Sequence, residues 1–129
     1  MPGALLTEES AVVVRALVVQ SRSDVARAVS VTLADAGIEA LTVADGFAAA
    51  DAIAAWDPHV VLVDLTLAPL DGWYVLAFAA GRPGGPLVVA RVADPSEAER
   101  AIALGADAWV DSDVHVVAEA GRLMAALAA

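Results

Sequence analysis

The chain has 129 residues, 60% of them hydrophobic, and its seven basic and 17 acidic residues give a formal net charge of −10. A charge of that sign opposes contact with nucleic-acid phosphates, so we expect no nucleic-acid partner. All seven basic residues are Arg, and the absence of Lys and Cys excludes Schiff-base lysines, thiol nucleophiles and disulfides.

The N-terminal segment and the hydropathy pattern bear on location. No uncharged apolar stretch approaches the roughly 20 residues that a membrane span requires. The first 14 residues lack the Lys or Arg that begins a secretory signal. We therefore expect no membrane partner and a cytoplasmic location, and we interpret residues 1–14 as an N-terminal tail and residues 15–129 as one domain.

Apolar β-rich runs alternate with stretches of helical pattern after the tail. Strands are predicted at 15–20, 39–43, 59–64, 87–91 and 108–111. Helices are predicted at 24–36, 47–56, 72–80, 96–104 and 114–128. Five strands that are each followed by a helix predict an α/β fold, in which a doubly wound five-stranded parallel sheet carries helices on both faces.

Turn and cap residues fall between the predicted elements. Gly37 follows the first helix as a C-terminal cap, and Asp45 precedes the second helix. Asp94, Pro95 and Glu97 supply an N-cap, a proline at the first helical position and an acid three residues after the cap. These signals support the alternation of strands and helices.

Asp64 is the first candidate site residue. In an open α/β sheet, ligands bind beyond the carboxyl ends of the strands, where the strand order reverses. For a sheet of order 2-1-3-4-5, that point lies between the first and third strands, which end at Gln20-Ser21 and Asp64. A carboxylate after an apolar strand is costly unless it is paired or lies at the mouth of a cleft.

Two segments carry a resemblance to a known family. Residues 61–72, VLVDLTLAPLDG, resemble the phosphoacceptor segment of bacterial response-regulator receiver domains, with Gly72 eight residues after Asp64 and Pro69 one place later than usual. Residues 105–110, GADAWV, resemble the glycine, acid and aromatic pattern at the fifth strand of that family. The resemblance covers about residues 15–128.

The resemblance implies a flavodoxin-like fold of sheet order 2-1-3-4-5 and phosphoryl transfer from a histidine kinase to Asp64. In receivers an acidic pair after the first strand helps to hold Mg²⁺, a hydroxyl follows the fourth strand, a Lys follows the fifth, and a fifth-strand aromatic reports the state. The corresponding positions here are Gln20 and Ser21, Ala90, Ser112, and Trp109. This degenerate site predicts weak Mg²⁺ binding at most, with Asp64 as the one remaining carboxylate ligand.

Several interpretations of these residues stay open. Asp64 is either a slow phosphoacceptor or an inherited carboxylate that is hydrogen-bonded to nearby amides. Arg91 is the alternative to Ala90 at the hydroxyl position, and Arg22 either pairs with Asp64 or is solvated. Trp109 is either locked inward over the small side chain of Ala90, mimicking an activated state, or is an exposed docking anchor.

The predicted function is that of an atypical receiver domain in two-component or phosphorelay signalling, acting through protein–protein contacts with Asp64 as the residual phosphoacceptor. The expected partners are a histidine kinase or a downstream effector, and a second copy through the last helix, where Met124 and Leu127 are among the apolar residues. The alternatives are a phosphorylation-independent pseudo-receiver and a flavodoxin-like module that binds a small molecule. With no nucleophile–base pair visible, we do not expect an enzyme.

Overall fold

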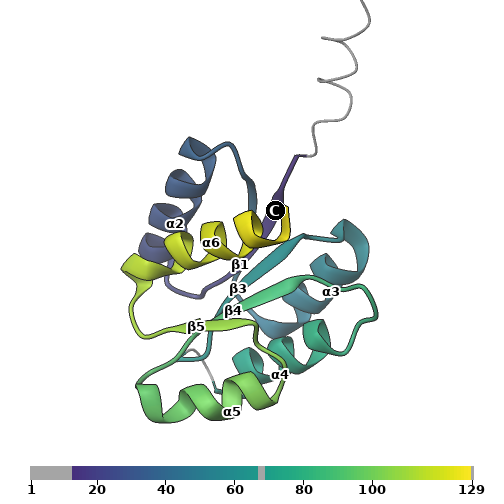
Figure 1. The fold of residues 1–129 in the computed structure, drawn as a ribbon, viewed down its shortest axis with the longest axis vertical. Helices are drawn as coiled ribbons and strands as arrows, with labels where there is room; N and C mark the ends of the chain where they lie inside the picture. The colour runs from purple at the N-terminus through teal and green to yellow at the C-terminus, as the bar shows by residue number, and fades with distance from the viewer. Residues whose placement is uncertain (1–12, 67–68, 129) are drawn as a thin grey trace, which may run out of the picture.

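One parallel sheet organises the structure, a computed structural model that describes residues 13–66 and 69–128. The sheet has the order β2-β1-β3-β4-β5 (Figure 1). Its strands are β1 (Arg15–Val19), β2 (Glu39–Val43), β3 (Val60–Asp64), β4 (Leu87–Arg91) and β5 (Ala108–Val110). Every neighbouring pair is parallel, so the predicted sheet type and strand order are confirmed.

Helices cover both faces of the sheet. They are α2 (Ser23–Asp35), α3 (Gly46–Trp56), α4 (Pro69–Ala80), α5 (Ala98–Ala103) and α6 (Val116–Ala128), with 3-10 turns η1 (Pro95–Glu97) and η2 (Asp113–His115). Helices α2 and α6 lie on one face, and α3, α4 and α5 lie on the other (Figure 1). None of the described helices combines the length and the apolarity that a membrane crossing demands.

Side chains of β3 alternate between two hydrophobic layers. Val61 and Val63 pack beneath α3, α4 and α5, whereas Val60 and Leu62 pack beneath α2 and α6. All five residues of β3 are buried. Because helices cover both faces, a central strand of this sheet is apolar along its whole length rather than on alternate residues.

Three helices start two or more residues away from their predicted starts. Helix α4 begins at Pro69 rather than at residue 72, because the fixed φ of a proline suits the first turn of a helix. The predicted helix 96–104 opens as the 3-10 turn η1, in which the Asp94 carboxylate accepts from the Ser96 N–H at 2.7 Å. The predicted helix 114–128 opens as the 3-10 turn η2, so α6 begins only at Val116. Apart from Val13 and Val14, the predicted tail lies outside the described residues.

Residues of the 105–110 motif hold the start of β5 against α4 and β4. Gly105 has a φ of +113°, and a Cβ there would lie 2.3 Å from the Cβ of Ala80, so no side chain fits. Asp107 accepts from the Val88 N–H at 2.7 Å, and its own N–H donates to the Val88 carbonyl at 2.8 Å. Asp107 therefore fixes the start of β5 to β4.

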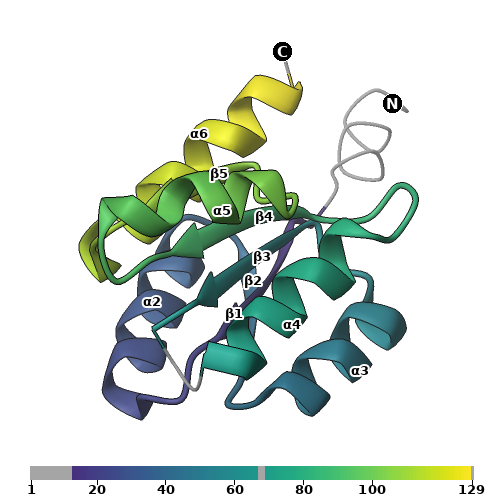
Figure 2. The same ribbon diagram turned by 90° about the horizontal axis from the view of Figure 1, so that it is seen from below.

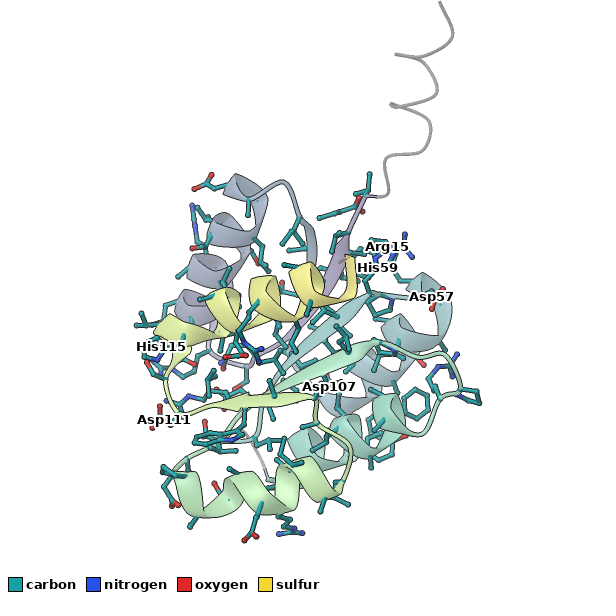
Figure 3. The ribbon with its side chains drawn as sticks, viewed as in Figure 1. Arg15, Asp57, His59, Asp107, Asp111 and His115 are labelled. Atoms are coloured by element: carbon teal, nitrogen blue, oxygen red, sulfur yellow. The ribbon has the colours of Figure 1, made fainter. Side chains whose placement is uncertain are left out.

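Arg15 connects the first strand to the end of α3 at the amino edge of the sheet (Figure 3). Its guanidinium donates to the carbonyl of Trp56 at 3.1 Å and to that of Asp57 at 2.6 Å. Asp57, at a φ of 53°, ends the helix. The backbone N–H of Arg15 donates to Nδ1 of His59 at 2.9 Å, which gives this histidine a structural partner.

Candidate functional site

Asp64 lies at the carboxyl end of β3 and is only 6% exposed. Its Oδ2 accepts from Nε2 of Gln20 at 2.7 Å. Its Oδ1 accepts from the N–H of Thr66 at 2.8 Å and from the Thr66 hydroxyl at 2.5 Å. Both carboxylate oxygens therefore hold donors that belong to the chain itself.

Gln20 is held in one orientation by the backbone around it. Its side-chain Oε1 accepts from the N–H of Arg22 at 3.0 Å, and its own N–H donates to the carbonyl of Val43 at 3.0 Å. Because the amide oxygen is bonded to the Arg22 N–H, the amide nitrogen is the atom that faces Asp64. Position 20 thus presents a hydrogen-bond donor to the carboxylate.

This arrangement does not fit Mg²⁺, which takes oxygen ligands. Gln20 turns its nitrogen toward Asp64, and Ser21, the second position of the expected acidic pair, is exposed. Over residues 13–66 and 69–128, no three His, Asp or Glu side chains gather into a group that could hold a metal ion.

The residue beside Asp64 on β4 is Arg91, its partner in the sheet register. Its Nε lies 3.3 Å from Oδ1 of Asp113, and the two side chains are 23% and 28% exposed. Ala90 points to the other face of the sheet, where it is fully buried beneath α3, α4 and α5. Ala90, which the resemblance assigns to the hydroxyl position, therefore does not lie beside Asp64, because neighbouring residues of a strand face opposite sides.

A small cavity separates these polar groups. Its volume is about 20 Å³, and a single water needs roughly 10–15 Å³ on this measure. Its polar lining is Gln20, Asp64, Arg91 and Asp113, and its apolar lining is Val18, Val19, Val25, Val29, Leu62, Val63 and Val116. The cavity has room for about one water and is too small for the organic ligand that the small-molecule alternative requires.

Comparisons place this geometry among known structures. No family model and no curated protein matches the chain. A putative response regulator from Chloroflexus aurantiacus has a TM-score of 0.77 at 20% identity, over 88% of this chain and 99% of that chain. The chemotaxis response regulator CheY4 of Vibrio cholerae has a TM-score of 0.74 at 21% identity, over 86% and 98%. The chain has the fold of response-regulator receiver domains.

Other receivers agree with this assignment. The signal receiver domain of a response regulator from Bermanella marisrubri has a TM-score of 0.75 at 21% identity, covering 85% of this chain and 97% of that chain. The near-complete coverage of these domains confirms, at the level of the fold, the resemblance carried by residues 61–72 and 105–110.

Gly72 brings α4 close to the end of β3 in this receiver fold. A Cβ at position 72 would lie 3.0 Å from the carbonyl oxygen of Asp64 and 3.1 Å from the Cα of Leu65. Such contacts are tight, so the glycine permits the approach of the first turn of α4 to Asp64. Two residues of the intervening loop, Leu67 and Ala68, lie outside the described residues.

Ser112 and Trp109 are the residues that the resemblance assigns to the Lys and switch-aromatic positions of receivers. The Ser112 hydroxyl accepts from the N–H of Val114 at 3.2 Å and caps η2. Trp109 is 37% exposed and lines two shallow surface hollows together with Ile102. The inward-locked interpretation of Trp109 is therefore wrong, and its surface position agrees with the docking-anchor alternative.

Arg22 pairs with its neighbour and not with Asp64. Its Nη2 lies 3.5 Å from Oδ2 of Asp24, and both side chains are largely exposed. Sequence reasoning also missed Thr66, although a hydroxyl two residues after an aspartate is typical of local side-chain turns. No comparable signal in the sequence pointed to Asp113 as the partner of Arg91.

Proposed function

We propose that this chain is a pseudo-receiver: a signalling module of the receiver fold that acts through protein–protein contacts and whose input is not phosphorylation of Asp64. The observation that carries the proposal is that both oxygens of the Asp64 carboxylate are already hydrogen-bonded within the chain. Three donors from Gln20 and Thr66 bond its two oxygens, and the side chain is 6% exposed. On this proposal the chain is not an enzyme.

Among residues 13–66 and 69–128, the side chains around Asp64 do not supply what a phosphoryl group requires. A phosphorylated carboxylate brings about two negative charges and three acceptor oxygens, which need cations and donors around them. Gln20 is neutral, and the guanidinium of Arg91 already pairs with Asp113. The cavity beside Asp64, of about 20 Å³, is too small to take the added group.

The contact surface that we propose is the side formed by α5, β5 and α6, which follow one another in Figure 1. Large apolar side chains are exposed there, namely Ile102 at 45%, Leu104 at 41% and Trp109 at 37%. Aromatic and aliphatic side chains of this kind serve as anchors in protein interfaces. The partner is a histidine kinase or a downstream effector. Self-association through α6 stays a prediction, and the side chains of Met124 and Leu127 lie outside the described part of that helix.

The first test is an amide NMR titration with Mg²⁺, followed by beryllofluoride as a phosphoryl mimic. We expect the amide signals around Asp64 and Trp109 to stay unchanged at millimolar concentrations. Shifts that cluster at Asp64, reach Trp109 and vanish in Asp64→Asn would establish a working phosphoacceptor and overturn the proposal.

A second test addresses the contact surface. Trp109→Ala should weaken binding to a cognate kinase or effector by about tenfold, as is usual for an aromatic anchor. Leu41→Ala, which changes a residue of similar exposure on β2, is the matched control and should leave that affinity unchanged. Equal affinities of the wild-type and Trp109→Ala proteins would exclude this surface.

A further inference from the structure

Two exposed aromatic side chains lie together on the face of the molecule that α3 and α4 form. Phe47, in the first turn of α3, is 84% exposed, and Tyr74 of α4 is 51% exposed. The two helices run side by side (Figure 2). With Gly46 and Asp71, these rings line a shallow hollow of about 420 Å³. Exposed aromatic surface that lines a hollow is characteristic of an interaction site.

The other aromatic rings on the described helices are covered by arginines of the same chain. The pairs are Arg15 over Trp56 at 5.9 Å, Arg82 over Phe78 at 5.6 Å and Arg100 over Trp73 at 4.5 Å. Such guanidinium–ring contacts are favourable because the ring face carries negative potential. Within residues 13–66 and 69–128, no arginine covers Phe47 or Tyr74 in this way.

The charged side chains at the hollow are acidic, so their charge has the same sign as the negative potential of the ring faces. Asp71 lines the hollow directly. Asp51 lies four residues after Phe47 on α3, a spacing that places the two side chains on one face of the helix. The described residues that line the hollow include no basic side chain. The hollow therefore offers two rings and the carboxylate of Asp71 to a cation, with Asp51 on the same face of α3 as Phe47.

We propose that this aromatic hollow, defined by Gly46, Phe47, Asp71 and Tyr74, binds a basic amphipathic segment of a protein partner. The apolar side chains of the segment pack on the rings, and its Arg or Lys side chains lie against the ring faces and the carboxylate of Asp71. The surface is separate from the proposed contact surface on α5, β5 and α6, so the inference goes beyond the proposed function.

Charge also argues against a second copy of this chain as the occupant. Two copies bring together formal net charges of −10 each. A two-fold contact at the hollow places each Asp71 near its own counterpart and supplies no cation to the rings. A basic partner supplies cations both to the ring faces and to the carboxylate of Asp71.

The test is an NMR titration of the ¹⁵N-labelled protein with a short amphipathic helical peptide of Leu, Ala and Arg. Its counterpart with Glu in place of Arg is the control peptide. We expect the Arg peptide to shift the amide signals of the first turns of α3 and α4, and the Glu peptide to shift none. Shifts spread evenly over the acidic surface, or equal binding of the Glu peptide, would overturn the proposal.

Variants of the protein sharpen this test. Phe47→Ala and Tyr74→Ala should each weaken binding of the Arg peptide by about tenfold, and Asp71→Asn by about threefold. Val31→Ala removes a side chain that is 53% exposed on α2, across the sheet, and should not change the affinity. Because Phe47 is 84% exposed, its replacement leaves the core intact, which an unchanged melting temperature checks. Unchanged affinity in Phe47→Ala, or self-association that Phe47→Ala abolishes, would refute a basic partner at the hollow.

Discussion

Arg91 and Asp113 join the end of β4 to the turn that precedes α6, with 3.3 Å between Nε and Oδ1. Arg91 is the register partner of Asp64, so this ion pair lies beside the candidate site. The link ties together the carboxyl ends of β4 and β5. We infer that it restricts the movement of these two strand ends relative to each other.

Replacing Arg91 tests the strength of that link. Arg91→Met keeps much of the side-chain volume but leaves Asp113 without its cation. Since both groups are about a quarter exposed, we expect a loss of about 1–2 kcal/mol in the free energy of unfolding, between the values for exposed and buried pairs. Urea denaturation measures it. The control is Arg22→Met, which removes an exposed pair with Asp24 and should cost under about 0.5 kcal/mol. Equal losses in the two variants would contradict the prediction.

Gln20→Leu should destabilise the protein through Asp64. The change removes the donor to Oδ2 and leaves a buried carboxylate oxygen without a partner, which costs about 1–3 kcal/mol in the free energy of unfolding. The measurement is a double-mutant cycle with Asp64→Leu. We expect the double variant to be more stable than the sum of the single losses predicts, and additive losses would mean that the two side chains are not coupled.

Two glycine substitutions should change the free energy of unfolding in opposite directions. Gly105→Ala forces a side chain into a positive-φ residue and against Ala80, which we expect to cost about 2–4 kcal/mol in the free energy of unfolding. Gly121→Ala, inside α6 with open space around it, should add about 0.5–1 kcal/mol. Thermal and urea unfolding of both variants check the prediction. A tolerated Gly105→Ala would show that the contact between α4 and the loop before β5 is looser than described.

Asp94 supplies a pH-dependent contribution to stability. The hydroxyl of Ser96, and then its backbone N–H, hold the pKa of Asp94 below its ordinary value of 3.8. A lowered pKa means that the ionised carboxylate stabilises the fold above pH 3.8, and that this contribution is lost as pH falls through the folded-state pKa. Ser96→Ala should raise the pKa of Asp94 toward 3.8 in a carboxyl NMR titration, and Ser96→Thr should keep it low. An unchanged pKa in Ser96→Ala would remove the hydroxyl as the cause.

The fold was accessible from the sequence because its signals are local. The continuous apolar run of β3 predicted a strand that is covered on both faces, and the structure confirms it. The start of α4 at Pro69 was not predicted, because the Asp-Gly pair at 71–72 indicated a helix that begins at residue 72. Proline at a helix start is as strong a signal and was the correct one.

The site was predicted less completely because its partners are distant in the sequence. Asp64 and Gln20 were placed correctly at neighbouring strand ends, and they bond across a separation of 44 residues. The choice between Ala90 and Arg91 depends on a single step of strand register, which reverses the face that a side chain occupies. The exposure of Trp109 depends on how α5 and α6 pack beside β5. The residues next to Trp109 in the sequence do not predict this packing.

The direction of α6 fixes where the chain can be tethered. Helix α6 starts just after the carboxyl end of β5 and packs on β3, β4 and β5, and its 13 residues extend about 20 Å, comparable to the height of a five-residue strand. It therefore returns to the amino edge of the sheet, where β1 begins at Arg15. A linker, label or solid support attached at either described end leaves the opposite edge, with Asp64 and the aromatic hollow, facing outward. Immobilised protein should thus present the Asp64 site and the aromatic hollow to a binding partner without steric hindrance from the attachment.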